Sequence, residues 1–164
     1  MPIQLLDTSI TGLASGGLPS SIITSTNLAS SGRLTFQTEA RTSNHSLGGD
    51  SGWQDHLSTT FTAGVASRAI FWFSPSCGYE AGAVQGFFRF LLDGSKVGYN
   101  WCGGRQSDNN GAGAGGGCYY ADVSAGSHTV MVQARNSVGG TTWQINYWNL
   151  DGYAASMLGV MYYA

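Results

Sequence analysis

Charge is the property this sequence has least of. Asp, Glu, Lys and Arg make up only 10% of its 164 residues, against roughly 25% in an average soluble domain. Lysine occurs once, at Lys96, and the formal net charge is -2. Nucleic-acid-binding proteins carry a basic footprint, so this balance argues against a nucleic-acid partner. Because charge keeps monomers apart in solution, a poorly charged chain is typical of a protein whose surface is covered by partners.

Long apolar runs are also missing. No stretch approaches the roughly 20 apolar residues of a membrane-spanning helix. The first residues, Met1 to Asp7, lack the basic and apolar regions of a signal peptide. We therefore expect a chain that is made in the cytosol, carries no cleaved secretion signal and has no membrane partner.

Cysteine is scarce and odd in number, with Cys77, Cys102 and Cys118. An odd count leaves at least one thiol free or paired between chains. We expect reduced, partly buried thiols; the alternative is a disulfide between Cys102 and Cys118 that closes the glycine-rich segment between them. No CxxC pair occurs, which argues against a zinc knuckle.

The sequence offers no combination of nucleophile, base and acid that would form a catalytic site. The segment 49–52 (Gly-Asp-Ser-Gly) resembles the nucleophile segment of chymotrypsin-like serine proteases. However, only His45 precedes Ser51, there are too few residues before it for a barrel, and Trp53 departs from the family's pattern. The interpretation we favour is a polar turn. No enzymatic activity is expected.

Metal-binding patterns are equally weak. His45, His56 and His128 show neither HxH nor HExxH spacing. The segment 108–111 (Asp-Asn-Asn-Gly) offers oxygen atoms but lacks the acidic density of a calcium site. We expect no metal and no cofactor.

What the sequence does have begins with an unusual first segment, residues 1–32. It is rich in Ser, Thr and Gly, shows no sustained period, and could not bury enough apolar surface to fold alone. Its scattered apolar side chains nevertheless suggest docking. We interpret it as an extended arm that reaches a neighbouring subunit or a capsid; the alternative is a disordered tail. The predicted contact residues are Ile3, Leu5, Ile10, Leu13, Leu18, Ile22, Ile23 and Leu28.

Residues 33–164 show short β-rich runs separated by turn residues. About nine strands are expected, at the spacing typical of antiparallel sandwiches and barrels, and no segment has the period of an amphipathic helix. Asp93-Gly94 between two runs is a strong hairpin signal. The apolar run at the end of the chain is expected to be a central strand of its sheet. The expected strands cover residues 34–40, 57–62, 67–73, 85–92, 95–101, 118–123, 127–135, 142–148 and 156–163.

Segment 103–117 contains too much glycine for a strand and lacks the Gly-Lys-Ser/Thr ending of a phosphate loop. We expect a long loop, either a solvent-exposed tip or a segment ordered against a partner.

Three segments carry a family likeness. Residues 8–29 resemble the lead-in of many tailed-phage fibre and head-decoration proteins. The hairpin at 89–98 (RFLLDGSKVG) and the strand pair at 123–136 (VSAGSHTVMVQARN) resemble the compact β domain that follows it. That domain is similar to the trimeric jelly roll of the tumour-necrosis-factor and complement type.

The resemblance implies an all-β jelly-roll sandwich at 33–164 behind an N-terminal arm at 1–32. It also implies a virion protein, a homotrimer that cements major capsid proteins on the capsid surface. The alternative is a receptor- or glycan-binding fibre head, with loops 43–56 and 103–117 as its site. Aromatic residues dominate cores and interfaces alike. The predicted trimer-interface residues are Phe71, Phe73, Phe88, Tyr147 and Tyr162.

Overall fold

The computed structural model describes residues 5–6, 9–10, 33–49, 51–81, 84–106, 115–138, 142–146 and 155–164. These residues form strands and their connections, with no helix among them, so none that could span a membrane. Apart from the two-residue pair β1 and β2, the strands fall into three antiparallel sheets. The strand bounds are β1 Leu5–Leu6, β2 Ser9–Ile10, β3 Leu34–Arg41, β4 His45–Leu47, β5 Gln54–Ala63, β6 Ser67–Ser74, β7 Cys77–Ala81, β8 Val84–Leu92, β9 Ser95–Gln106, β10 Gly117–Val123, β11 Gly126–Asn136, β12 Thr142–Ile145 and β13 Ser156–Tyr163.

Eight of these strands build a sandwich of two four-stranded sheets. The first has the order β10-β6-β13-β3 and the second the order β5-β11-β8-β9. If the eight sandwich strands are numbered one to eight along the chain, the strand orders of the two sheets are 6-3-8-1 and 2-7-4-5. This is the jelly-roll arrangement. The expected all-β jelly-roll sandwich is therefore confirmed. The last strand, β13, lies between β6 and β3, as its apolar sequence predicted.

Aromatic and branched side chains from both sheets fill the space between them. Phe71 and Phe73 of β6 meet Phe88 and Phe90 of β8, with ring centroids 6.1 Å apart for Phe71–Phe90 and 4.9 Å apart for Phe73–Phe88. Phe61 of β5 packs against Tyr162 of β13 at 4.9 Å. The interior is thus occupied by side chains, as in close-packed protein cores.

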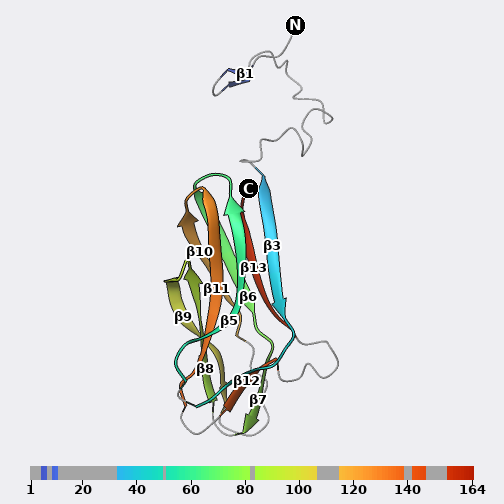
Figure 1. The fold of residues 1–164 in the computed structure, drawn as a ribbon, viewed down its shortest axis with the longest axis vertical. Coiled ribbons are helices and arrows are strands. Elements are labelled where there is room, and N and C mark those ends of the chain that lie inside the picture. The colour runs from blue at the N-terminus through green and yellow to red at the C-terminus, as the bar shows by residue number, and fades with distance from the viewer. Residues whose placement is uncertain are drawn as a thin grey trace.

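The two ends of the sandwich differ. At one end the connections are short: residues 64–66 join β5 to β6, and Asp93-Gly94 join β8 to β9 with positive φ at both positions, as the hairpin signal predicted. At the other end the connections are long, and three of them contribute β4, β7 and β12, which pair in the order β4-β12-β7 (Figure 1). We call this three-stranded sheet the cap sheet.

The first and last residues of the domain meet at the end with short connections. The Ala164 backbone N–H donates to the Arg33 carbonyl at 2.9 Å, and the Gly64 N–H donates to the Tyr163 carbonyl at 3.0 Å. Figure 1 places the C-terminus beside the start of β3, away from β7 and β12. Residues 1–32 therefore join the sandwich at the end opposite the cap sheet.

Several expected boundaries need correction. β9 continues through Gln106, because Gly104 and Arg105 pair with Gly86 and Gln85 of β8, so the glycine-rich loop is shorter than residues 103–117. β12 ends at Ile145 rather than at residue 148. The strands β4 and β7 were not predicted, since three to five residues carry too little alternation to stand out.

We predict that Gly86→Ala destabilises the fold by about 1–3 kcal/mol, the usual cost of overpacking a core. A Cβ at this position would overlap the indole ring of Trp143, which is buried on β12 and packs on Phe88. Urea denaturation would measure the loss. Gly48→Ala is the matched control, because a Cβ there meets nothing within 4 Å; equal stability of the two variants would contradict the packing of the cap sheet on β8.

Candidate interaction surface

The outer face of the β10-β6-β13-β3 sheet is made mainly of apolar side chains. Because side chains alternate along a strand, one set points into the core and the other points out. The outward set on these four strands forms a continuous area that we call the apolar face. Its large members are Leu34, Phe36, Ile70, Trp72, Tyr120, Met157, Met161 and Tyr163.

Strand register lines these residues up in rows across the sheet. Phe36 of β3 is opposite Met161 of β13, Met161 is opposite Ile70 of β6, and Ile70 is opposite Tyr120 of β10. In the next row Trp72 lies between Gly159 and Cys118. The apolar side chains therefore form one connected surface rather than separate spots.

The surface is open to solvent in the single chain. Phe36 is 62% exposed and Tyr120 55%, while Leu34, Met157 and Tyr163 each exceed 40%. Single exposed apolar residues are normal on soluble proteins, but a contiguous apolar patch marks an interaction site.

Trp72 and Gly159 give the centre of the apolar face its shape. The indole ring of Trp72 lies directly over Gly159, where any Cβ would overlap it. Gly159 is buried beneath that ring although it stands on the outer side of the sheet. Phe36 meets Trp72 edge to face, with centroids 6.5 Å apart. Glycine here lets a large aromatic lie flat on the strand, which presents its broad surface outward.

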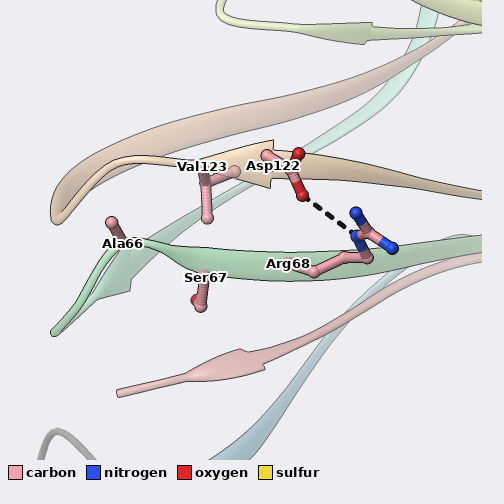
Figure 2. A pocket seen from close by; sticks show the side chains of 5 residues that line it. All are labelled: Ala66, Ser67, Arg68, Asp122 and Val123. Atoms are coloured by element: carbon pink, nitrogen blue, oxygen red, sulfur yellow. Dashed lines mark hydrogen bonds and ion pairs between the residues drawn. The ribbon is translucent and has the colours of Figure 1, made fainter.

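Charge appears only at one margin of the apolar face. Arg68 of β6 reaches across to Asp122 of β10, with Nε 3.0 Å from Oδ1, and both side chains are largely exposed. The Arg68 guanidinium also lies over the Tyr120 ring, 4.7 Å from its centroid. Figure 2 shows this pair in a shallow pocket that Ala66, Ser67 and Val123 complete. The hydrogen bond to Asp122 raises the pKa of Arg68 further, and the two side chains of opposite charge lie side by side.

The opposite outer face, on the β5-β11-β8-β9 sheet, carries a network of hydrogen-bonded polar side chains, with Met131 beside them. Arg89 of β8 donates to the Gln133 amide oxygen of β11 at 2.8 Å and 2.6 Å, and Gln133 donates to Asp55 of β5 at 2.7 Å. Thr60 and Thr129 hydroxyls lie 3.2 Å apart. These polar side chains form hydrogen bonds to one another across three strands. They can face water, whereas the apolar face has no comparable network.

The structure puts most of the predicted trimer-interface residues somewhere else. Phe71, Phe73 and Phe88 are at most 2% exposed and Tyr162 is 7% exposed within one chain. These four side chains already form the core, and Tyr147 lies outside the described residues. A contact with another subunit has to use the side chains that point out of the sandwich, for example Ile70 and Trp72.

The predicted arm contacts fall almost entirely outside the described residues. Leu5 and Ile10 are the exceptions, and they are paired across the short antiparallel strands β1 and β2. Ile3, Leu13, Leu18, Ile22, Ile23 and Leu28 lie outside the described residues.

Other residues singled out in the sequence have plain structural partners. The Ser51 hydroxyl accepts a hydrogen bond from the Asn136 backbone N–H at 3.2 Å. Cys118 is a free, exposed thiol on the apolar face, so the alternative disulfide with Cys102 is not formed. Within the described part of the chain, no three His, Cys, Asp or Glu side chains converge as a metal would require. Residues 108–111 lie outside it.

A buried polar layer joins the cap sheet to the sandwich, and sequence reasoning did not find it. Asn146, just after β12, donates to the Arg41 carbonyl at 2.8 Å and accepts from the Ser156 hydroxyl at 2.8 Å. Asn44 donates to the Gln144 side chain at 2.6 Å. Asn146, Gln144 and Ser156 are buried; buried polar groups need partners, and each of these has one.

Two histidines form the most unusual contact in that layer. His45 of β4 and His56 of β5 stack with ring centroids 5.1 Å apart, and their Nδ1 atoms lie 2.8 Å apart. One Nδ1 must carry a proton and the other must not. Burial lowers the pKa of His56 to about 3, helped by His45 and Arg41. Burial and then Arg41 also lower the pKa of His45, so both rings are neutral at pH 7.

No protein-family model and no curated protein sequence matches the chain. Among solved structures it is similar to chains of infectious bursal disease virus. For the Gx strain the identity is 13% and the TM-score 0.39, over 80% of this chain and 32% of the viral chain. For the Gt strain the values are 13%, 0.40, 96% and 40%. For T=1 particles derived from the virus they are 12%, 0.38, 100% and 40%. The chain spans less than half the length of these viral chains.

We predict that acid destabilises the fold through the histidine pair. His56 titrates near pH 6.5 when unfolded but near 3 when folded. The unfolded state therefore binds more protons below pH 6.5, and the free energy of unfolding falls as the pH drops. From pH 7.5 to pH 5 the loss from His56 amounts to about 2 kcal/mol. Urea titrations at several pH values would measure it.

His56→Gln should flatten this pH dependence, whatever it does to stability at pH 7.5. His128→Gln is the control of opposite sign. The hydrogen bond to Asp93, 2.7 Å from His128 Nδ1, raises the pKa of His128 and lowers that of Asp93. From pH 7.5 to pH 5 this pair therefore adds stability as His128 gains its charge beside ionised Asp93, and its removal should steepen the acid loss. An unchanged slope in His56→Gln would refute the role of the pair.

Proposed function

We propose that this chain is a non-enzymatic structural subunit of a virus particle: a homotrimer that decorates the capsid and clamps neighbouring major capsid proteins. The observation that carries the proposal is the apolar face, an uncovered hydrophobic sheet on a chain that has little charge elsewhere. Apolar burial of about 25 cal/mol per Å² is the main force available to such a surface. A solitary molecule would have to leave this surface in water.

The interior of the jelly roll supports a structural role. Viral capsid proteins, lectins and cupins all use this fold, so the fold alone does not choose a function. Here Phe61, Phe71, Phe88 and Phe90 fill the space between the sheets, where a jelly roll that holds its ligand between the sheets needs room. This leaves the outer surfaces of the sandwich for binding, which suits a protein that holds other subunits together.

The two ends of the sandwich fit a clamp. Residues 1–32 leave from the end with short connections, next to Leu34 and Tyr163 of the apolar face. The cap sheet and the long connections occupy the other end (Figure 1). An arm at one end can hold the shell while the other end faces outward. Three arms on one trimer would multiply a weak contact into avid attachment.

A receptor- or glycan-binding head of a phage fibre is the second candidate. One observation favours it: the described parts of the two expected binding segments, 43–49 with 51–56 and 103–106 with 115–117, lie at the same end of the sandwich. Loops clustered on a rigid scaffold are a common way to build a binding site. Immunogold electron microscopy with antibodies to the chain distinguishes the two, since a decoration protein is labelled over the capsid and a fibre head at a fibre tip.

We predict that Ile22→Asp combined with Ile23→Asp weakens capsid attachment about 100-fold or more, because two isoleucines that become buried against the capsid would contribute about 1.5–3 kcal/mol each. The oligomer of the purified chain should be unchanged. Cosedimentation with capsids that lack the chain measures the attachment.

Ser20→Asp combined with Ser21→Asp is the matched control, since it adds the same two charges at adjacent positions without removing apolar side chains. It should attach far better than the isoleucine variant. Full attachment by both variants would contradict the role of the arm, and labelling of no virus particle at all would contradict the proposed function.

A further inference from the structure

We infer that the apolar face is where another copy of this same chain packs, with Phe36, Met161 and Trp72 at the centre of the contact. This inference rests on the proposed function, because it names the partner of that surface. It also replaces the interface residues that the sequence suggested. Those residues point into the core, and their neighbours along each strand, which point outward, form the contact.

The size of the apolar face fits contact between copies. Four strands about 4.8 Å apart and eight residues long at about 3.3 Å each span roughly 500 Å². Two such faces pressed together bury about 1,000 Å², and three meeting around an axis bury about 1,500 Å². Specific interfaces begin at about 1,000 Å² of total buried surface. The face is therefore large enough to hold copies together and small enough that one chain folds without it.

The charge of the apolar face permits contact with itself. A surface that carries charge of one sign repels its own copy, whatever its apolar content. Here the charged groups at the margin are Arg68 and Asp122, which neutralise each other within one chain at 3.0 Å. The outward positions of β3 and β13 are Leu34, Phe36, Thr38, Ala40, Met157, Gly159, Met161 and Tyr163, none of them charged.

The side chains at the centre have the character of interface anchors. Large aromatic residues, together with Met and Arg, are enriched where proteins meet and contribute most of the binding energy. Phe36 and Trp72 meet edge to face and Met161 is in register with Phe36. A matching face of a second copy supplies apolar groups to cover all three. On the opposite outer face, Arg89 is already paired within one chain, because it donates to Gln133 in the network that continues to Asp55 and lies over the Trp53 ring.

Cys118 provides a native probe of this surface. It is a free, exposed thiol in register with Trp72. In a background with Cys77→Ser and Cys102→Ser, the rate of maleimide labelling reports whether the apolar face is covered. Light scattering on the same sample reports the mass. We expect an oligomer in which Cys118 labels at least tenfold more slowly than in the diluted monomer.

Matched substitutions identify the face that is used. Phe36→Thr should weaken self-association about 30-fold, the effect of losing an interface anchor, and restore fast labelling of Cys118. Met161→Thr should act in the same direction. Met131→Thr makes the same change on the outer face of the other sheet, where Met131 is opposite Ser58 and Leu91, and should change self-association less than about threefold. Threonine suits strands, so circular dichroism should show that all three fold.

Each other outcome overturns the inference. A monomer with protected Cys118 means that another part of the same chain covers the face. An oligomer with freely labelled Cys118, or one that Met131→Thr weakens as much as Met161→Thr, means that copies meet through a different surface. A monomer with free Cys118 means that copies do not meet. None of these results bears on capsid labelling, so failure of the inference and failure of the proposed function are separate.

Discussion

Strand alternation, applied to strands that are apolar on both sides, is the constraint on which this molecule depends. In β6, Ala69, Phe71 and Phe73 point into the sandwich and are buried. Their neighbours Ile70 and Trp72 point out, and they are apolar as well. A sheet with one polar face can stand in water, whereas a sheet of this kind needs cover on both sides. The second β-sheet covers the inner side of β6, and the outer side is left for something else.

This constraint also explains what the sequence could and could not predict. Alternation along 127–135 placed Val130, Val132 and Ala134 on one face, and the structure buries all three. The run 67–73 predicts a strand but does not show which of its side chains face the core, because every residue from Ala69 to Phe73 is apolar. The larger aromatics were assigned to the interface, yet Phe71 and Phe73 belong to the core. Only the register against β13 and β10 decides which set faces outward.

Topology was easier to predict than the cap sheet. The presence of the sandwich strands, the Asp93-Gly94 hairpin and the central place of β13 follow from local residue patterns that hold anywhere in a chain. The pairing of β4, β12 and β7 joins residues about 100 positions apart, such as Leu47 with Trp143. Its polar layer depends on Asn146 and on the contact of His45 with His56, and no local pattern indicates such meetings.

The unequal distribution of polarity over the surface ties the fold to an assembly. One outer face holds a hydrogen-bonded network, one end is closed by a cap sheet over a polar layer, and the other end holds Arg33 and Ala164, the first and last residues of the described sandwich. The remaining face is apolar from Leu34 to Met157. Exposed apolar sheets are an aggregation hazard when their contact is not specified. The indole ring of Trp72 lies over Gly159, and Phe36 meets it edge to face, so the centre of this face has a fixed shape. A fixed shape allows one complementary surface to bind in preference to others, which limits non-specific aggregation.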